Sequence, residues 1–479
     1  MRRVVSMSAL CLALAGCALQ PPPTHTGVIG KALPEGTRIP PAWQSATGSG
    51  AVADDWLKTF NDPALNAIVA EALANNIDLR QAADRVEVAR QSAVVLGARL
   101  LPQIGGQAGA RSSHDFGNER HIEHTHNDWY AALGMSWELD VWGRLRARRA
   151  AAEAGVEVTE LDYAYARQSL AATVATSWYL ATEAHQLVAL AERSVKVYGD
   201  LFELAKIKHA SGKSSELDVV DARARVEIAQ SALEAARNTY AEARRTLELL
   251  LGRYPAAEIE AAAAYPPLPP STGAGVPASL LERRPDIVAA ERRVLAAFRQ
   301  EEEARLALLP DLSISLAGER LSDHLIRQLN LDPWLVSAGI GTVIPIYQGG
   351  ALRAQVRIAS AQQAEAVAKY GGVVLNAFRE VEDALAGEQV LSQRLRYEQR
   401  ALADRDRAVQ LATVQYRAGK RDLLWVEQLQ TEQLAVEESV IQLRNAQIIN
   451  RIQLHLALGG SFDMEPQVAG VPDGKGTSP

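Results

Sequence analysis

The chain has 479 residues, of which 48% are hydrophobic and 22% are charged, and its formal net charge at pH 7 is −7. These values are typical of a folded protein with room for a large core or several modules. The negative charge, in a sequence without a basic stripe, argues against nucleic acid as the main partner. With only 5% aromatic residues and an abundance of Ala, Leu, Glu and Arg, the composition favours helices over sheets.

The first sixteen residues are typical of a signal peptide rather than of a folded domain. Two arginines at positions 2 and 3 precede an apolar run of twelve residues at 4–15. Such a run is shorter than the ~20 residues that a membrane-spanning helix needs, and it is typical of a secretory signal. We therefore predict that residues 1–16 are removed.

The signal ends in Leu-Ala-Gly-Cys at 14–17, which resembles a bacterial lipobox. In such a motif the cysteine becomes the mature N-terminus and carries a diacylglycerol group, so Cys17 is the expected lipid anchor. Cleavage also removes Cys11, which leaves no partner for an intrachain disulfide. Ala18 rather than an aspartate follows the cysteine, and this favours the outer membrane as the destination. An ordinary signal peptide followed by a chance cysteine is the alternative.

The mature chain contains two copies of one pattern. Residues 78–102 align with 286–310 at an offset of 208, and Gly-Lys and Leu-Gly pairs recur farther on at an offset of 207. We place the first repeat at 64–252 and the second at 286–459, joined by a proline-rich linker at 253–285. The acylated arm at 17–63 and the tail at 460–479 are expected to be extended or irregular.

Each repeat is predicted to contain a strand hairpin, at 103–142 and at 311–347. Apolar and polar residues alternate at 129–141, 311–316 and 336–346, and more weakly at 103–112. An apolar face opposite a polar one suits a half-buried sheet of a soluble protein or a membrane barrel with a wet lumen. Four of the eight tryptophans lie in or beside these strands, as an interfacial girdle requires: Trp129, Trp137, Trp142 and Trp334.

Long helical hairpins are predicted after the strands, at 144–252 and 351–459. The segments 144–210 and 351–417 have 67 residues each and no proline, so each can form a helix about 100 Å long. The returning helix of the first repeat has ten apolar residues in a heptad pattern, and the second repeat keeps seven of them. This pattern predicts antiparallel coiled hairpins with turns at 210–215 and 417–422.

Together these elements predict a mainly α-helical fold with four strands per chain. No run of about 18 apolar residues follows the signal, so strands would have to make any membrane crossing. Four strands are too few to close a barrel, for which about eight are needed. A membrane barrel therefore requires an oligomer, and the residues alone leave two or three chains open.

Nearly the whole mature chain resembles the TolC-like outer-membrane efflux proteins. It is most similar to their OprM/NodT-like lipoprotein branch, which works with resistance-nodulation-division (RND) pumps. The segments that carry the resemblance are "WLKTFNDPAL" at 56–65, "LERRPDI" at 281–287, "LALLPDLSISL" at 306–316 and "LALGG" at 456–460. They occur in family order, together with the lipobox.

The resemblance implies a homotrimer with a twelve-stranded β-barrel in the outer membrane and a periplasmic α-barrel of coiled helices. It further implies two protein partners, a periplasmic adaptor and an inner-membrane RND pump. The expected function is a passive conduit that exports small molecules such as drugs, toxic compounds or metals, without a cofactor. The adaptor is expected to meet the hairpin tips at Gly212, Lys213, Gly419, Lys420 and Arg421.

The resemblance also places the gate at the helix tips. The family's second hairpin usually carries two carboxylates in a motif like "LLDVLDAQ", whereas this chain has Trp425 and Gln428 in "LLWVEQLQ". The first hairpin, "ELDVVDAR", keeps Asp218 and Asp221. Carboxylates from three chains can form a cation-selective ring, but an acid in the first turn of a helix also has a purely structural use. The gate candidates are Asp218, Asp221, Asp422, Trp425 and Glu427, with Trp425 either an apolar plug or a packing residue.

The sequence offers weaker support for three other functions. Histidines gather at His114, His121, His124 and His126 and could bind zinc or copper, but they fall in a loop between strands and we assign no metal site. The sequence has no Gly-x-Ser-x-Gly, Walker or His-Glu-x-x-His motif, so we do not expect an enzyme. A lipid-anchored periplasmic coiled-coil scaffold without a pore is the alternative function, and the alternating strands argue against it.

Overall fold

The computed structural model describes residues 19–45, 50, 52, 54–115, 124–270, 273–322 and 334–461. Cys17, most of the tail and the side chains of the histidine-rich segment therefore lie outside the description. The helices are α2 (His25–Ala32), α3 (Trp56–Thr59), α4 (Pro63–Asn75), α5 (Ile77–Ala98), α6 (Arg144–Ala210), α7 (Glu216–Leu250), η1 (Pro277–Ser279, a 3-10 helix), α8 (Leu280–Arg283), α9 (Pro285–Leu306), α11 (Ala351–Arg417) and α12 (Leu423–Ala457). The strands are β1 (Gln103–Asp115), β2 (His124–Leu139), β3 (Asp311–Ser322) and β4 (Trp334–Val343).

The chain forms two compact units, and each is described by itself. The first, which we call the sheet unit, comprises Met1–Thr37, Ala83–Asp162 and Asp286–Val373. The second, which we call the tip unit, comprises Arg38–Ala82, Tyr163–Pro285 and Val374–Pro479. Each sequence repeat contributes to both units, so the units do not coincide with the repeats.

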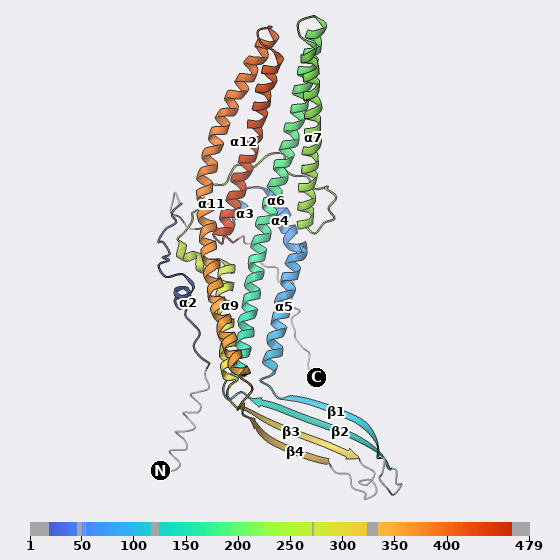
Figure 1. Ribbon diagram of the computed structural model, residues 1–479, viewed down its shortest axis with the longest axis vertical. Coiled ribbons are helices and arrows are strands. Elements are labelled where there is room, and N and C mark those ends of the chain that lie inside the picture. Colours follow the sequence, from blue (N-terminus) through green and yellow to red (C-terminus); the bar gives the residue numbers. More distant parts are fainter. Residues whose placement is uncertain are drawn as a thin grey trace. The chain divides into compact units, whose positions relative to one another are not determined.

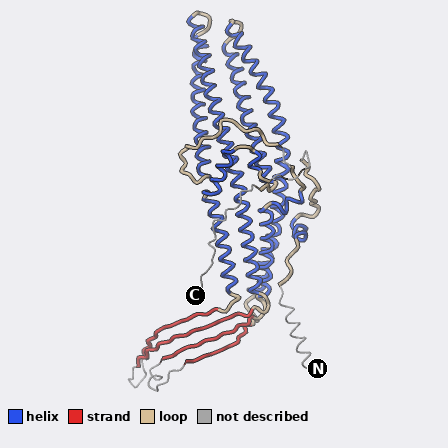
Figure 2. The backbone as a smooth tube through the Cα atoms, turned by 180° about the vertical axis from the view of Figure 1, so that it is seen from behind, coloured by secondary structure: helices blue, strands red, loops and turns tan. Residues whose placement is uncertain are grey.

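The sheet unit contains one antiparallel sheet in the order β1-β2-β3-β4 (Figures 1 and 2). Directly opposed residues lie on the same face of an antiparallel sheet. One such row joins Ile104, Met135, Leu316 and Ala338, and the adjacent row on the other face joins Gln103, Ser136, Ser315 and Gly339. The sheet therefore has an apolar face and a polar face, as the alternation predicts. Its apolar side chains include some that are well exposed: Ile104, Leu133, Val336 and Ile340.

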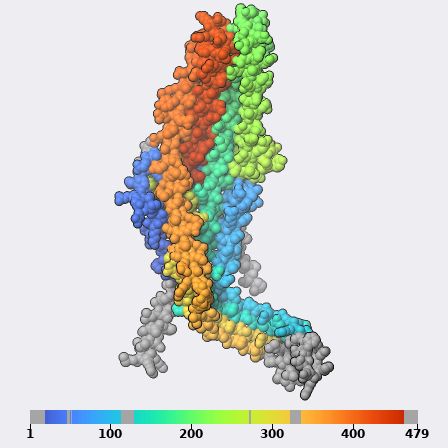
Figure 3. Space-filling model, in the orientation of Figure 1, coloured from blue at the N-terminus to red at the C-terminus, as the bar shows by residue number. Residues whose placement is uncertain are grey.

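The tip unit contains two helical hairpins, α6 with α7 and α11 with α12, whose turns lie at the same end (Figure 1). Figure 3 shows the second hairpin, in orange and red, packed beside the first hairpin, in green. All ten predicted heptad positions of α7 and all seven of α12 are buried or half-buried. Both long helices have the bounds that the sequence predicts, because no proline interrupts them and each ends at a glycine-containing turn.

Farther from its turns, the tip unit has a core built around large side chains. Trp56, Phe60, Leu65, Tyr179 and Leu247 are all at most 1% exposed and belong to one apolar cluster. Asp62 of the "WLKTFNDPAL" segment caps α4 by accepting hydrogen bonds from Ala64 N and Leu65 N, and its other oxygen accepts one from Trp178 Nε1 at 3.0 Å. This segment thus fixes the start of α4 against α6.

The prediction of an extended or irregular N-terminal arm is wrong over His25–Ala32, which form helix α2, and over Trp56–Thr59, which form helix α3. The Thr24 hydroxyl caps α2 by accepting a hydrogen bond from Gly27 N, and Val28 is only 4% exposed. Burial of one apolar residue and a side-chain cap stabilise a short helix that composition alone does not favour. The proline-rich linker likewise contains two short helices, η1 and α8.

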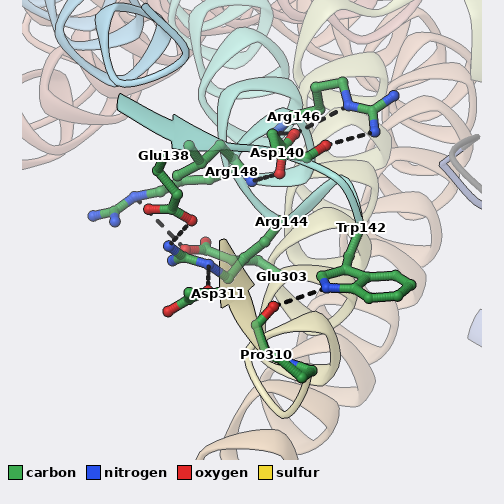
Figure 4. Close-up of polar contacts among 10 residues, drawn as sticks. Glu138, Asp140, Trp142, Arg144, Arg146, Arg148, Glu303, Pro310 and Asp311 are labelled. Atoms are coloured by element: carbon green, nitrogen blue, oxygen red, sulfur yellow. Dashed lines mark hydrogen bonds and ion pairs between the residues drawn. The ribbon is translucent and has the colours of Figure 1, made fainter. Parts of the chain in front are cut away.

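The strands of the sheet unit join the helices at a polar junction (Figure 4). Asp140 accepts hydrogen bonds from Leu145 N at 2.9 Å and Arg146 N at 3.0 Å, so it caps the start of α6. Arg144 binds Glu138 at 2.6 Å and lies 3.6 Å from Asp311, which links β2 to β3. Burial raises the pKa of Glu303, which faces Arg148 at 3.7 Å. These ion pairs and caps fix the direction in which α6 leaves the sheet.

Candidate functional site

The two turns of the tip unit have the same structure. Gly212 and Gly419 have positive φ angles of 70° and 75°, a region that L-residues with side chains disfavour. In each turn the next residue closes the helix with a backbone bond to a carbonyl five residues earlier, Lys213 N to Lys208 O at 2.8 Å and Lys420 N to Gln415 O at 2.9 Å. This is a Schellman ending, which lets the chain reverse after 67 helical residues. Both lysines are exposed.

We expect Gly212→Ala and Gly419→Ala each to destabilise the tip by about 1 kcal/mol, because alanine pays the steric cost of the left-handed conformation. Thermal unfolding of the detergent-purified protein, together with hydrogen exchange of the tip amides, measures this loss. Gly199→Ala is the matched control, since Gly199 lies inside α6 with no heavy atom within 4 Å of an added Cβ. The control is expected to be neutral or stabilising. Equal effects at Gly199 and Gly419 would contradict the turn geometry.

The acids at the start of each returning helix serve as caps. Ser215 and Asp218 form a reciprocal capping box at the start of α7. The Asp422 carboxylate accepts a hydrogen bond from Trp425 N at 3.1 Å at the start of α12. A structural use therefore exists for Asp218 and Asp422, two of the five gate candidates.

Glu427 is an acid buried in the tip unit near the turns. Its side chain is 1% exposed, and no group in the described residues donates a hydrogen bond to either carboxylate oxygen. The side chain of Arg225 on α7 lies between two acids, with its Nε 3.8 Å from Glu427 Oε2 and 4.0 Å from Asp221 Oδ2. A buried carboxylate with one distant cation and no hydrogen bond is unstable in its charged form.

Burial raises the pKa of Glu427 to about 8. The neighbouring Asp221 and Asp218 carboxylates contribute to this rise, whereas Arg225 opposes it. Two ionised carboxylates repel, but a proton on Glu427 allows its carboxyl to donate a hydrogen bond to Asp221. The packed tip therefore holds Glu427 in its neutral form at pH 7.

Aromatic and cationic side chains connect the two hairpins around this acid. The Lys208 ammonium of α6 lies 3.7 Å from the centre of the Tyr416 ring of α11 and donates a hydrogen bond to the Tyr416 carbonyl. The Tyr198 hydroxyl of α6 is 2.9 Å from the Thr431 hydroxyl of α12. Burial raises the pKa of Tyr416, and Asp218 and Glu427 add to the effect. These contacts hold the hairpins together next to the turns.

Trp425 is half-buried, and its ring packs against the apolar cluster that contains Leu423 and Val426. The Arg421 guanidinium lies 4.7 Å from the centre of this ring. The contacts of Trp425 with its own chain fit the interpretation as a packing residue, and they leave part of the ring free for an apolar constriction in an assembly.

The tip unit thus brings together three of the predicted residues, Asp218, Asp221 and Glu427, and places Asp422 and Trp425 at the helix start. Sequence reasoning missed Arg225, Lys208 and Tyr416. Asp221 and Arg225 are four residues apart on one helix, and this spacing alone could have predicted that Arg225 lies beside Asp221. No comparable signal exists for Lys208 and Tyr416, which meet only because α6 and α11 are neighbours.

None of the helices in the described part of the chain combines the length and the hydrophobicity needed to cross a lipid bilayer.

Comparison with known proteins gives consistent matches over the whole chain. A family model described as outer membrane efflux protein matches residues 68–253 and again 276–460. The chain is 30% identical over 477 residues to the pyoverdine export outer membrane protein OpmQ of Pseudomonas putida KT2440, a match that covers 97% of this chain and 98% of OpmQ. It is 29% identical over 462 residues to the cation efflux system protein CusC of Escherichia coli O6:H1, covering 95% and 97%. A solved structure of CusC matches with a TM-score of 0.77 at 28% identity, over 90% of this chain and 99% of that one.

Proposed function

Since this chain belongs to the outer membrane efflux protein family, we propose that it acts as a lipid-anchored homotrimeric conduit with a gate at its hairpin tips. Members of this family are outer-membrane efflux channels of tripartite systems, and they are channels rather than enzymes. The chain is an outer-membrane efflux channel in this sense. We further propose that three copies form the channel, that Cys17 carries its lipid anchor, that the hairpin tips form its gate, and that an adaptor and a pump are its partners.

The observation that supports an oligomeric barrel is the sheet with two free edges, and the family resemblance favours three copies over two. In the order β1-β2-β3-β4, each outer strand pairs on one side only within the described residues. Unpaired strand edges in a bilayer are not tolerated, and closure into a barrel satisfies them. Three copies supply twelve strands, with the apolar face that contains Leu133 and Ile340 toward lipid and the polar face toward water.

The hairpin tips are the proposed contact with a periplasmic adaptor. Leu217 is 73% exposed and Leu424 is 59% exposed, and the two leucines occupy equivalent positions of the two repeats. An exposed lysine accompanies each leucine, Lys213 in one turn and Lys420 in the other. An apolar side chain beside a cation suits a protein partner with an apolar pocket and an acidic rim. An inner-membrane RND pump is the third proposed component.

The exported compound is proposed to be selected upstream of this channel. Two relatives of nearly equal identity are named for different cargoes, a pyoverdine and cations. A passive conduit can serve either, because selection then lies with the pump and the adaptor. A susceptibility panel on a deletion strain, with antibiotics, dyes, solvents and copper and zinc salts, identifies the cargo class.

Purification in detergent followed by planar-bilayer recording tests the conduit against the pore-free scaffold. We expect a heat-labile trimer on gels and stepwise conductance after insertion. Cys17→Ser is expected to remove the acyl group, detected as a mass shift of the mature N-terminus, and to leave the conductance steps intact. A protein that stays monomeric and gives no conductance would instead support the lipid-anchored scaffold.

A further inference from the structure

The start of the N-terminal arm is held at the strand–helix junction of the sheet unit. Gln20 N donates a hydrogen bond to Glu302 Oε1 at 2.6 Å, and Arg299 Nη1 donates one to Gln20 O at 2.9 Å. Leu19 Cδ2 lies 3.3 Å from the position that a Cβ on Gly143 would take, in the turn between β2 and α6. The chain is therefore fixed at this junction only two residues after the lipobox cysteine.

From the junction the arm runs over α9 and reaches α11. His25 Nδ1 lies 2.8 Å from Glu291 Oε2 of α9. The Ala32 carbonyl lies against Gly371 of α11, so closely that a side chain at position 371 has no room. Because an arm that starts at an acylated cysteine must begin in lipid, it lies outside the lumen of the channel. The faces of α9 and α11 that the arm covers are therefore outward faces.

Two arginines of α11 lie on that same outward face, nearer the sheet. Arg353 precedes Gly371 by 18 residues, or about five full turns, and Arg357 precedes it by 14 residues, or about four turns. Both side chains are exposed, and neither has a hydrogen-bond or ion-pair partner within the described residues. Other arginines near the junction are paired, Arg144 with Glu138 and Arg299 with Glu302.

The surroundings of these arginines fit the headgroup region of a bilayer. Ile346 and Tyr347, just before α11, are 91% and 87% exposed. Trp142 is exposed at the other strand–helix turn, with its Nε1 bonded to the Pro310 carbonyl at 2.8 Å. Aromatic side chains beside cationic ones mark the interfaces of membrane proteins. At i and i+4 on one helix face, the two guanidinium groups can bind phosphate oxygens together.

We propose that Arg353 and Arg357 bind the phosphate of an anionic phospholipid, in the leaflet that holds the acyl chains of Cys17. This inference rests on the proposed function, since it requires the sheet in the outer membrane and the acylated arm outside the channel. Its physical basis is the placement of two unpaired cations at the depth where the arm enters lipid. An anionic bilayer surface attracts basic residues that lie near it.

The test compares lipid binding by wild type with that by Arg353→Gln/Arg357→Gln. The purified trimer is titrated with dioleoyl phosphatidylglycerol or dioleoyl phosphatidylethanolamine, and retained lipid is counted by native mass spectrometry. We expect wild type to retain phosphatidylglycerol preferentially and the double variant to lose that preference at least fivefold. Arg396→Gln/Arg400→Gln is the matched control, with the same helix, spacing and charge change at exposed positions, and it is expected to bind as wild type does.

Equal retention of the two lipids by wild type, or equal losses in the two double variants, would overturn the proposal. If the double variant fails to assemble, the salt dependence of wild type decides: the preference must fall between 50 and 500 mM salt for a phosphate contact. Inorganic phosphate as a competitor must not displace the lipid at equal concentration. Planar-bilayer conductance of the same preparation separates the proposed phospholipid site from the proposed channel function. A trimer that conducts but shows no lipid preference contradicts only the phospholipid site.

Discussion

Raising the pH from 5.5 to 8.5 is expected to increase the open probability of the reconstituted channel, and Glu427→Gln is expected to abolish that increase. In the packed tip the pKa of Glu427 is raised to about 8, above its ordinary value of 4.5. The packed state therefore binds a proton that a loosened, solvated tip releases at neutral pH. Its stabilisation is fully present below pH 4.5 and is lost as the pH rises toward 8.

The size of this effect follows from the same linkage. Each pH unit within that window removes about 1.4 kcal/mol from the packed state, so the rise from 5.5 to 8 removes about 3 kcal/mol. This free-energy loss is not reduced for screening by solvent, because the Glu427 side chain is almost completely buried. The charged groups that act on it come from α7 and are Asp218, Asp221 and Arg225, and the titratable Tyr416 of α11, which Lys208 of α6 contacts, also lies near it. Glutamine keeps the shape of the neutral acid and removes its titration.

Single-channel recording at pH 5.5, 7.0 and 8.5 measures the effect. Glu438→Gln is the matched control, because Glu438 is an exposed acid on the same helix that accepts a hydrogen bond from Gln442 four residues later. The control should follow the wild-type pH profile, and Glu427→Gln should stay near the low-pH value throughout. A wild-type slope that persists in Glu427→Gln would show that another group controls the tip.

Much of the fold could be predicted from local patterns in the sequence. The bounds 144–210 and 351–417 follow from uninterrupted helix formers, and the two faces of the sheet follow from alternation with a period of two. The resemblance to the TolC-like outer-membrane efflux proteins is confirmed by the family match and the solved relatives. Helix α2 was missed because its stability comes from a cap and from Val28 packing against distant residues.

The candidate site was less predictable, because burial at the tip depends on four helices at once. Glu427 was a candidate from its position in the hairpin, but no feature of the sequence indicated that its side chain is almost completely buried. A heptad pattern identifies the seam between two helices of one hairpin. It does not show which residues of α6 and α11 approach the returning helices, and so Lys208 and Tyr416 could not be foreseen. The gate roles of Asp218, Asp221, Asp422, Trp425 and Glu427 stay predictions.

Arg284 belongs to the "LERRPDI" segment and is 2% exposed, a burial that the sequence did not indicate. Its Nη1 donates hydrogen bonds to Glu380 Oε2 at 2.7 Å and to the carbonyl of Ala457 at 3.2 Å. Ala457 is the last residue of α12, so the guanidinium also faces the negative end of a helix. The arginine thereby joins α11 to the end of α12, and its guanidinium lies 6.0 Å from the centre of the Tyr165 ring of α6.

We expect Arg284→Ala to destabilise the protein by about 3 kcal/mol, because it removes the cation from Glu380, which keeps a hydrogen bond from Asn376, and takes a donor from a helix-terminal carbonyl. For a chain of this size that loss lowers the melting temperature by about 3 °C, which thermal unfolding of the purified protein measures. Arg245→Ala is the control, since Arg245 is exposed and has no ion-pair partner within the described residues. It should melt as wild type does.

A double-mutant cycle separates the charge pair from the packing of the arginine stem. If the unpaired Glu380 carboxylate causes most of the loss, then Arg284→Ala in a Glu380→Ala background should cost much less than it does in wild type. The remaining cost then reflects the Ala457 carbonyl and the contact of Arg284 Cγ with the backbone at Gly459, where an added Cβ would lie 3.1 Å away. Equal costs in both backgrounds would show that Arg284 stabilises the protein through packing and not through its charge pair with Glu380. A melting temperature of Arg284→Ala within about 1 °C of wild type would show that Arg284 does not stabilise the protein.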